Sequence, residues 1–263
     1  APTEIYTLSL HDALPIYLDD PRTTVLRRSI IRSKPFLEKI YLEWYGWVAS
    51  RLPRGSSPVV ELGSGAGFLD SFIPGLVTSE VLRCPFVRVV LDGCALPFPG
   101  SSLRALVMVD VFHHIPDAGA FLREASRCLE PGGRILMVEP WVTAWSRFVY
   151  ARLHHEPFDS MAQSWSFPAS GPLSGANSAL PWIVFQRDRA LFEERYPGLA
   201  IEGITVERPL TYLLSGGISL RTLMPGIAYR FWRCIEEMSA LKKYGMFVKI
   251  ELSRKTTEDP QWY

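Results

Sequence analysis

The part of the chain best suited to chemistry is residues 58–69, where an apolar run ends in Glu61 and is followed by Gly63, Gly65 and Gly67. An apolar run before a glycine-rich turn is typical of a buried parallel strand that leads into a helix. Glycine permits positive φ and has no Cβ, so a ligand can lie against the bare backbone. A carboxylate at the end of the strand repels phosphate and attracts a cation. The stretch therefore predicts a site for a cationic or amine-bearing ligand.

Three further acids, Glu80, Asp92 and Asp110, come at or near the ends of other predicted strands. A carboxylate accepts two hydrogen-bond donors at once, which suits paired hydroxyls or an exocyclic amine. The alternatives are a surface acid at Glu80 and a turn-capping acid at Asp92. These strands are expected at residues 76–81, 87–92 and 103–111.

Two pairs of histidines could act on a substrate. His113 and His114 follow the fourth predicted strand, and His155 lies in the titratable cluster 154–159. An imidazole beside an acid can accept a proton near neutral pH, so we select His155 and His114 as substrate-side catalytic candidates. The alternatives are a structural or site-lining role for His114 and a polar helix end at 154–159. Adjacent histidines point in different directions, and no H-x-x-x-H spacing or acidic partner pattern is present, so we predict no metal site.

The composition indicates a folded protein with a sizeable core. The chain has 263 residues, of which 48% are hydrophobic and 21% charged, with a net charge of +1. This length favours one α/β domain with additions, and the charge balance gives no argument for a nucleic-acid partner. We recognise no signal peptide and no apolar run long enough for a spanning helix. The four cysteines form no C-x-x-C pair, which favours reduced thiols in a cytoplasmic protein.

Residues 18–57 are expected to form a helical cap and a linker before the first strand. Apolar residues recur at helical spacing within 23–52, with an interruption near Pro35. Five basic residues in 22–34 fit a solvated helix face, a lid over the substrate, or a patch that contacts anionic membrane lipid. Residues 1–17 show little periodicity, and we treat them as a non-native or disordered segment.

The sequence E-L-G-S-G-A-G at residues 61–67 resembles motif I of the class I S-adenosylmethionine (SAM) methyltransferases. D-G-x-x-L-P-F at 92–98, D-V-x-H-H at 110–114 and L-x-P-G-G-R at 129–134 resemble segments of the type 11 group of that family, in the same order. The resemblance implies that SAM is the cofactor. It implies roles for Glu61 at the amino group of SAM, Glu80 at the ribose hydroxyls, and Asp92 with Gly93 at the adenine. The full set of expected cofactor-binding residues is Glu61, Gly63, Ser64, Gly65, Gly67, Glu80, Asp92, Gly93 and Asp110.

The resemblance also implies the fold. It is an α/β, Rossmann-like class I methyltransferase fold, with a seven-stranded, mostly parallel sheet, an antiparallel edge strand, and helices on both faces. The SAM-binding core would span 58–141, and a substrate-side lid with the C-terminal part of the same domain would span 142–254. The last strand is expected at 246–252, in the antiparallel position, and 255–263 as a disordered tail.

We therefore predict a SAM-dependent methyltransferase that acts on a small-molecule acceptor, and the aromatic residues around 161–182 favour an apolar or aromatic one. The alternatives are a catalytically inactive SAM-binding scaffold and an NAD(P)-dependent oxidoreductase. The third glycine comes one residue earlier than in the dinucleotide fingerprint G-x-G-x-x-G, which disfavours the oxidoreductase. Glu61 also disfavours it, because a carboxylate at this position repels phosphate. A nucleic-acid methyltransferase is disfavoured by the lack of an N/D-P-P-Y-type motif. The acceptor atom, the use of a base and the oligomeric state stay open.

Overall fold

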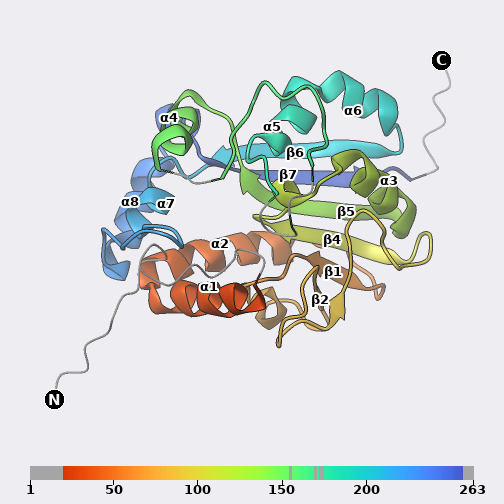
Figure 1. The fold of residues 1–263 in the computed structure, drawn as a ribbon, viewed down its shortest axis with the longest axis horizontal. Helices are drawn as coiled ribbons and strands as arrows, with labels where there is room; N and C mark the ends of the chain where they lie inside the picture. The colour runs from red at the N-terminus through yellow and green to blue at the C-terminus, as the bar shows by residue number, and fades with distance from the viewer. Residues whose placement is uncertain (1–19, 154–155, 169–170, 172–174, 257–263) are drawn as a thin grey trace.

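The computed structural model describes residues 20–153, 156–168, 171 and 175–256 (Figure 1). Three of the sequence predictions lie wholly or largely outside these residues: the N-terminal segment 1–17, the candidate His155, and the greater part of the tail 255–263. Among the described residues, no helix combines the length and the apolar character needed to cross a membrane.

A seven-stranded sheet forms the centre of the fold, in the order β3-β2-β1-β4-β5-β7-β6. Neighbouring strands from β3 to β5 pair in parallel, whereas β7 is antiparallel to both of its neighbours. The predicted mostly parallel, seven-stranded sheet with an antiparallel last strand is confirmed, but this strand was expected at the edge and instead lies between β5 and β6, because β6 pairs along its outer side. The strand bounds are β1 (Val59–Leu62), β2 (Val77–Glu80), β3 (Val89–Val90), β4 (Leu103–Val109), β5 (Leu129–Pro140), β6 (Leu199–Glu207) and β7 (Phe247–Arg254).

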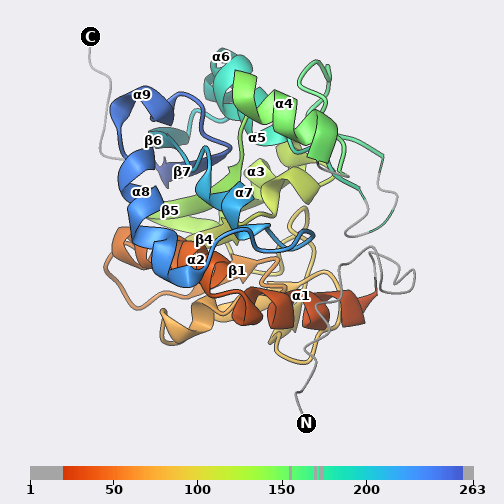
Figure 2. The same ribbon diagram turned by 90° about the vertical axis from the view of Figure 1, so that its left-hand side faces the viewer.

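Helices cover both faces of this sheet, with α1 and α2 on one side and α3, α5 and α6 on the other (Figures 1 and 2). The N-terminal region forms two helices that are separated at Pro35, as predicted. The α-helices are α1 (Pro21–Ser33), α2 (Pro35–Arg51), α3 (Ala118–Cys128), α4 (Ala144–Leu153), α5 (Leu180–Trp182), α6 (Arg189–Arg195), α7 (Thr211–Ser215), α8 (Tyr229–Glu236) and α9 (Ser239–Lys242). The shorter turns are η1 (Leu69–Ser71), η2 (Phe112–His114) and η4 (Gly226–Ala228), which are 3-10, and η3 (Ile183–Arg187), which is π-helical.

The helix that we expected directly after the glycine turn is wrong in extent. Only the single 3-10 turn η1 follows, and β2 begins at Val77. Pro74 and Gly75 lie between this turn and β2, and Gly75 adopts a φ of +78°, which prevents the turn from continuing as a helix. The short connection brings β2 next to β1 without a full covering helix.

Alternation along the strands divides the core between the two faces. In β4, Leu106 and Met108 pack with α3, η3 and α6, while Ala105 and Val107 pack with α1 and α2. This is the period-two pattern of a strand that is buried on both faces. Each predicted strand is therefore held in one register, which fixes where its carboxyl end lies.

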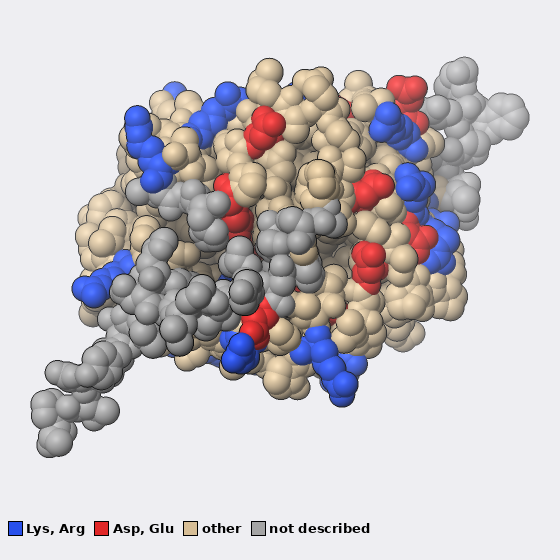
Figure 3. All heavy atoms as spheres, viewed as in Figure 1, with Lys and Arg blue, Asp and Glu red and all other residues tan. Residues whose placement is uncertain are grey.

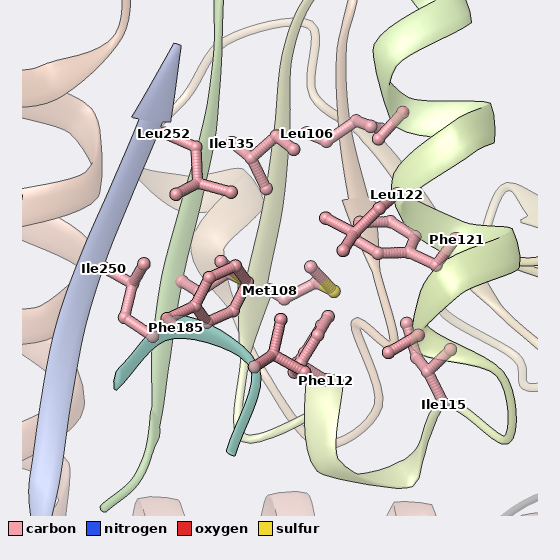
Figure 4. Close-up of a cluster of buried hydrophobic side chains, with 14 of the residues drawn as sticks. Leu106, Met108, Phe112, Ile115, Phe121, Leu122, Ile135, Phe185, Ile250 and Leu252 are labelled. Atoms are coloured by element: carbon pink, nitrogen blue, oxygen red, sulfur yellow. The ribbon is translucent and has the colours of Figure 1, made fainter. Parts of the chain in front are cut away.

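The first of these clusters also holds the turn that carries the two adjacent histidines. Phe112 and Ile115 flank His113 and His114, and both are part of the apolar cluster in Figure 4. The Phe112 ring lies 5.8 Å from that of Phe121 and 5.3 Å from that of Phe185. With Phe112 and Ile115 anchored in the core, η2 presents its histidines in a fixed position.

A buried ion-pair cluster ties the N-terminal helices to the C-terminal half. Arg208 is 0% exposed and follows β6 with a positive φ of +59°. Its guanidinium donates to Glu43 of α2 at 2.5 Å, to Glu207 at 3.1 Å and to the hydroxyl of Tyr229 in α8 at 3.1 Å. Trp44 of α2 also donates to Glu207, at 2.7 Å. The helical cap is thus connected to the far end of the sheet by charge-assisted hydrogen bonds.

Candidate active site

A cavity of about 740 Å³ opens at the carboxyl ends of β1, β2 and β4. Open α/β sheets bind ligands at this edge, and the volume lies within the usual range for small-molecule sites. Its lining includes every predicted cofactor residue and His114: Glu61, Gly63, Ser64, Gly65, Gly67, Glu80, Asp92, Gly93, Asp110 and His114.

The glycine turn is shaped by close approach of two side chains. Gly63 has a φ of +61°, and a Cβ there would lie 2.5 Å from Cγ2 of Val111. A Cβ on Gly67 would lie 2.6 Å from the hydroxyl oxygen of Tyr45. No side chain fits at either position without displacement, so the turn offers its backbone directly to the cavity.

Ser64 holds this turn against the neighbouring strand. Its N–H donates to the carbonyl of Ser79 at 2.8 Å, and its hydroxyl oxygen accepts from the N–H of Ser79 at 3.1 Å. The Ser79 hydroxyl in turn donates to the carbonyl of Glu61 at 2.6 Å. Ser64 lines the cavity, but its side chain is engaged in joining β1 to β2.

Two buried carboxyl groups, Glu61 and Glu80, and the half-buried Asp110 make one end of the cavity selective for donors and cations. Burial, with the nearby charges of Asp70 and Glu80, raises the pKa of Glu61 to about 7. Burial raises the pKa of Glu80, whose carboxylate accepts from the N–H of Val81 at 2.9 Å. Burial also raises the pKa of Asp110 to about 6, and this residue adopts a φ of +63° at the end of β4. These acids lack partners strong enough to offset desolvation, so a bound cation would stabilise them.

Asp92 lies at the rim of the same end. It is exposed, and its Oδ1 accepts from the N–H of Cys94 at 2.8 Å. One carboxylate oxygen of Asp92 therefore caps the turn, as the alternative interpretation of this residue predicted. Because Asp92 and Gly93 both line the cavity, capping and ligand contact are compatible.

The histidine turn carries a buried polar network. Glu139, at the end of β5, is 0% exposed; its Oε1 accepts from the N–H groups of Val111 and Phe112 at 2.9 and 2.8 Å. Its Oε2 lies 2.8 Å from Nδ1 of His113. Glu156 lies on the other side of the histidine, with its Oε2 3.4 Å from Nε2 of His113.

The two histidines have opposite electrostatic environments. Burial by itself lowers the pKa of His113. The hydrogen bonds to Glu139 and Glu156 outweigh this effect and raise the pKa well above its usual value. Burial and the charge of His113 lower the pKa of His114 to about 4, so this imidazole is neutral. Nδ1 of His114 lies 3.1 Å from the carbonyl oxygen of Gly175, which leaves Nε2 toward Glu156 and the cavity.

Comparison with known proteins finds a family model that matches the segment around the cavity. Residues 61–137 match the model of the methyltransferase domain, type 11. Residues 61–137 therefore resemble a methyltransferase domain. The matched segment runs from Glu61 through the glycine turn to β5, so it contains every predicted cofactor residue.

Curated methyltransferases resemble parts of the chain. The 2-methyl-6-phytyl-1,4-hydroquinone methyltransferase of Synechocystis is 33% identical over 184 residues, which cover 63% of this chain and 55% of that protein. The mitochondrial 2-methoxy-6-polyprenyl-1,4-benzoquinol methylase of Drosophila melanogaster is 27% identical over 112 residues, covering 43% of this chain and 34% of that protein. The chain thus spans about half or less of the length of these relatives.

A solved structure shares the fold. A chain from the complex of the Haloferax volcanii Trm112 methyltransferase activator with the putative methyltransferase superposes with a TM-score of 0.51 and 14% identity. The match covers 93% of the present chain and 100% of the other. At this identity the likeness shows the arrangement of elements alone.

SAM is the cofactor of the methyltransferase domain, and the cavity residues fit it. SAM carries an ammonium, a carboxylate, two ribose hydroxyls and an adenine amine, so it needs several acceptors and one cationic partner. Glu61, Glu80 and Asp92 provide the acceptors. Among the described residues, Nε of Arg27 in α1 is a buried side-chain donor without a hydrogen-bond partner, and Arg27 lines the cavity.

Arg27 is one of the cavity residues that were not predicted from the sequence. The basic character of residues 22–34 was the available signal, but it did not distinguish Arg27 from its neighbours. Helical packing turns Arg27 inward, together with Thr24 and Ile31, while Arg22 has an 82% exposed side chain. Tyr41 and Tyr45 of α2 complete this wall of the cavity.

Proposed function

We propose that this protein transfers the methyl group of SAM to a small-molecule acceptor with an apolar or aromatic body, such as a substituted hydroquinone or phenol. The observation that carries the proposal is the two-part cavity. The acidic end beside the glycine turn continues into an apolar wall with Ile115, Phe167 and Ile218. The hydroquinone and benzoquinol substrates in the names of two relatives belong to the same chemical class.

The cofactor would lie along the glycine turn. We assign Glu61 to the ammonium group, Glu80 to the ribose hydroxyls, and Asp92 with Gly93 to the adenine, as motif I and the D-G-x-x-L-P-F segment imply. We assign Arg27 to the carboxylate, because Arg27 lines a cavity otherwise rich in acids and its buried Nε–H has no hydrogen-bond partner among the described residues. SAM supplies an already activated methyl group, so the protein contributes mainly alignment and exclusion of water.

The acceptor would lie between the methyl group and the histidine turn. His114 lines the cavity, and its Nε2 lies 3.7 Å from Oε1 of Glu156, so an acceptor hydroxyl beside His114 would lie near this carboxylate. His155 is also kept as a substrate-side candidate on sequence grounds.

The direct test is methyl transfer from isotopically labelled SAM to a panel of acceptors. We expect label in prenylated and simple hydroquinones and phenols, and less in matched aliphatic alcohols. Binding of SAM without transfer to any acceptor of the panel would favour the inactive scaffold. Labelling of nucleic acid or protein instead would contradict the acceptor class.

Replacing Arg27 by alanine should weaken SAM binding about tenfold, because a charge-assisted hydrogen bond to a carboxylate contributes roughly 1.5–3 kcal/mol and part of the loss is recovered by water. Calorimetric titration measures the change. Arg22→Ala on the same helix removes an exposed arginine and is the matched control. Equal affinities in the two variants would remove Arg27 from the site.

Replacing Asp92 by asparagine should also weaken SAM binding, by about tenfold, while the fold is retained. Asparagine keeps an acceptor for the N–H of Cys94 but puts an amide donor where the adenine amine donates. Competition with adenosine should show the same loss, since the contact concerns the base. Unchanged affinity for both ligands would contradict the adenine assignment.

The surface charge agrees with a small-molecule acceptor. On the face in Figure 3, Lys and Arg side chains are interspersed with Asp and Glu outside the grey atoms. The near-zero net charge gives no extended basic field for nucleic acid. A cytoplasmic location stays a prediction, to be checked by fractionating cells that express the protein.

A further inference from the structure

Two histidines and a glutamate converge at the wall of the cavity. Nε2 of His113 and Nε2 of His114 lie 3.4 and 3.7 Å from the two carboxylate oxygens of Glu156. The three possible ligand atoms all lie within 4.8 Å of one another. Ligands at about 2.0–2.1 Å from a tetrahedral Zn²⁺ are roughly 3.4 Å apart, so the two histidine–glutamate distances are close to those of ligands around one ion.

Hydrogen bonds orient both imidazoles toward this point. Nδ1 of His114 lies 3.1 Å from the carbonyl oxygen of Gly175, which can only accept, so Nδ1 carries a proton and Nε2 has the lone pair. Nδ1 of His113 likewise donates to the Glu139 carboxylate at 2.8 Å. A carboxylate behind the distal nitrogen is the usual outer-shell support of a metal-bound histidine.

The support behind the histidines is rigid. Glu139 is fully buried and its other oxygen is held by two backbone N–H groups. Phe112 and Ile115, on either side of the histidines, are anchored in the apolar cluster of Figure 4. Glu156 approaches from the segment after α4, where it also accepts from the hydroxyl of Ser178 at 3.3 Å. The site is therefore built by two elements that are far apart in the sequence.

We propose that His113, His114 and Glu156 bind a divalent transition-metal ion such as Zn²⁺, Co²⁺ or Fe²⁺. Two imidazoles and one carboxylate suit these ions and leave coordination positions open. Because His114 lines the cavity, an open position faces the space assigned to the acceptor. Metal binding does not depend on methyl transfer. The role of the open position, which is to bind and acidify an acceptor hydroxyl, does rest on the proposed function.

The alternative to a metal ion at this position is a proton on Nε2 of His113. An imidazolium at His113 would donate to Glu139 on one side and to Glu156 on the other, which satisfies the same atoms without an ion. The two arrangements make different predictions, because only the first gives a metal spectrum and a stoichiometric metal content.

The test is titration of the chelator-treated, dialysed full chain with Co²⁺, followed by visible d–d absorption and by calorimetry. We expect one Co²⁺ per chain, micromolar or tighter binding, and displacement by Zn²⁺. Glu156→Gln and His114→Asn should each weaken Co²⁺ binding at least tenfold and change the spectrum. Glu139→Gln, behind the ligand, should weaken it about 10- to 100-fold.

Glu193→Gln is the matched control, since this glutamate lies on α6 with a 53% exposed side chain. Absence of a Co²⁺ spectrum in the wild-type chain would overturn the metal site, as would equal affinity in Glu156→Gln and Glu193→Gln. If Glu156→Gln does not fold, His114→Asn at the cavity wall decides the outcome. A SAM titration of the same samples keeps the two proposals separate, because SAM binding with no Co²⁺ binding overturns the metal site alone.

Discussion

Replacing Glu61 by glutamine is expected to weaken SAM binding by about 100-fold or more. The Glu61 carboxyl is 3% exposed at the end of β1, and the amide would exchange a buried ion pair with the ammonium group for a neutral contact. Loss of a buried charged partner typically costs about 3 kcal/mol, which corresponds to roughly 100-fold in affinity. Isothermal titration calorimetry at pH 7.5 measures the effect.

The same substitution is expected to stabilise the ligand-free protein at alkaline pH. The folded-state pKa of Glu61 is raised from 4.5 to about 7, so ionisation above pH 7 opposes folding. The cost develops as the pH rises from about 4.5 to 7 and reaches roughly 3 kcal/mol above that range. We therefore expect Glu61→Gln to be about 2–3 kcal/mol more stable than wild type at pH 8, with the difference disappearing near pH 5.

The pH dependence of SAM affinity gives a third readout for Glu61. Binding of the ammonium group requires the carboxylate, so wild-type affinity should fall about five- to tenfold between pH 7.5 and pH 6. The glutamine variant should change less over this range. A variant that binds SAM like the wild type, or that loses stability at pH 8, would contradict the assignment of Glu61.

Replacing Arg208 by methionine is expected to lower the free energy of unfolding by about 3–5 kcal/mol, because it removes the buried cation that Glu207 and Glu43 share. Glu207 is 9% exposed and would keep only Lys249, at 2.7 Å, as its cationic partner. Glu43 would keep Arg233, at 3.0 Å. Denaturant unfolding measures the loss, with the transition midpoint compared at constant slope.

The Arg208 variant also tests whether the helical cap depends on the C-terminal half. Since α1 carries Arg27 and α2 carries Glu43, loosening the cluster should weaken SAM binding as well as stability. Arg189→Met on α6, which breaks only an exposed pair with Glu193, is the control and should change stability by less than about 0.5 kcal/mol. A loss no larger than that of the control would show that the buried cluster is dispensable.

The cofactor half could be predicted from the sequence because its signals are local. The glycine turn, Asp92 and Asp110 each follow a strand with a strong apolar pattern, and parallel strands bring their carboxyl ends together. Nine expected cofactor residues therefore line one cavity. The antiparallel direction of β7 was expected only from the family resemblance, and its place between β5 and β6 rather than at the edge was not predicted, because strand periodicity carries no information on strand order.

The substrate half was predicted less well because its contacts join distant segments. No acidic partner for His113 and His114 was recognised at metal-ligand spacing in the sequence, yet the fold brings Glu156 and Glu139 to opposite sides of His113. Nothing in the sequence around Glu139 indicates that its side chain turns toward η2. Arg27 was one of five similar basic residues until packing of α1 selected it.

The measurement that tests the central claim most directly is calorimetric titration of the purified chain with SAM, with its demethylated product and with NADH. We expect micromolar binding of SAM and of the product, at one site per chain, and no heat of binding with NADH. Binding of NADH without SAM would contradict the methyltransferase assignment of the cavity, and so would SAM binding that is unchanged by Glu61→Gln and by Asp92→Asn.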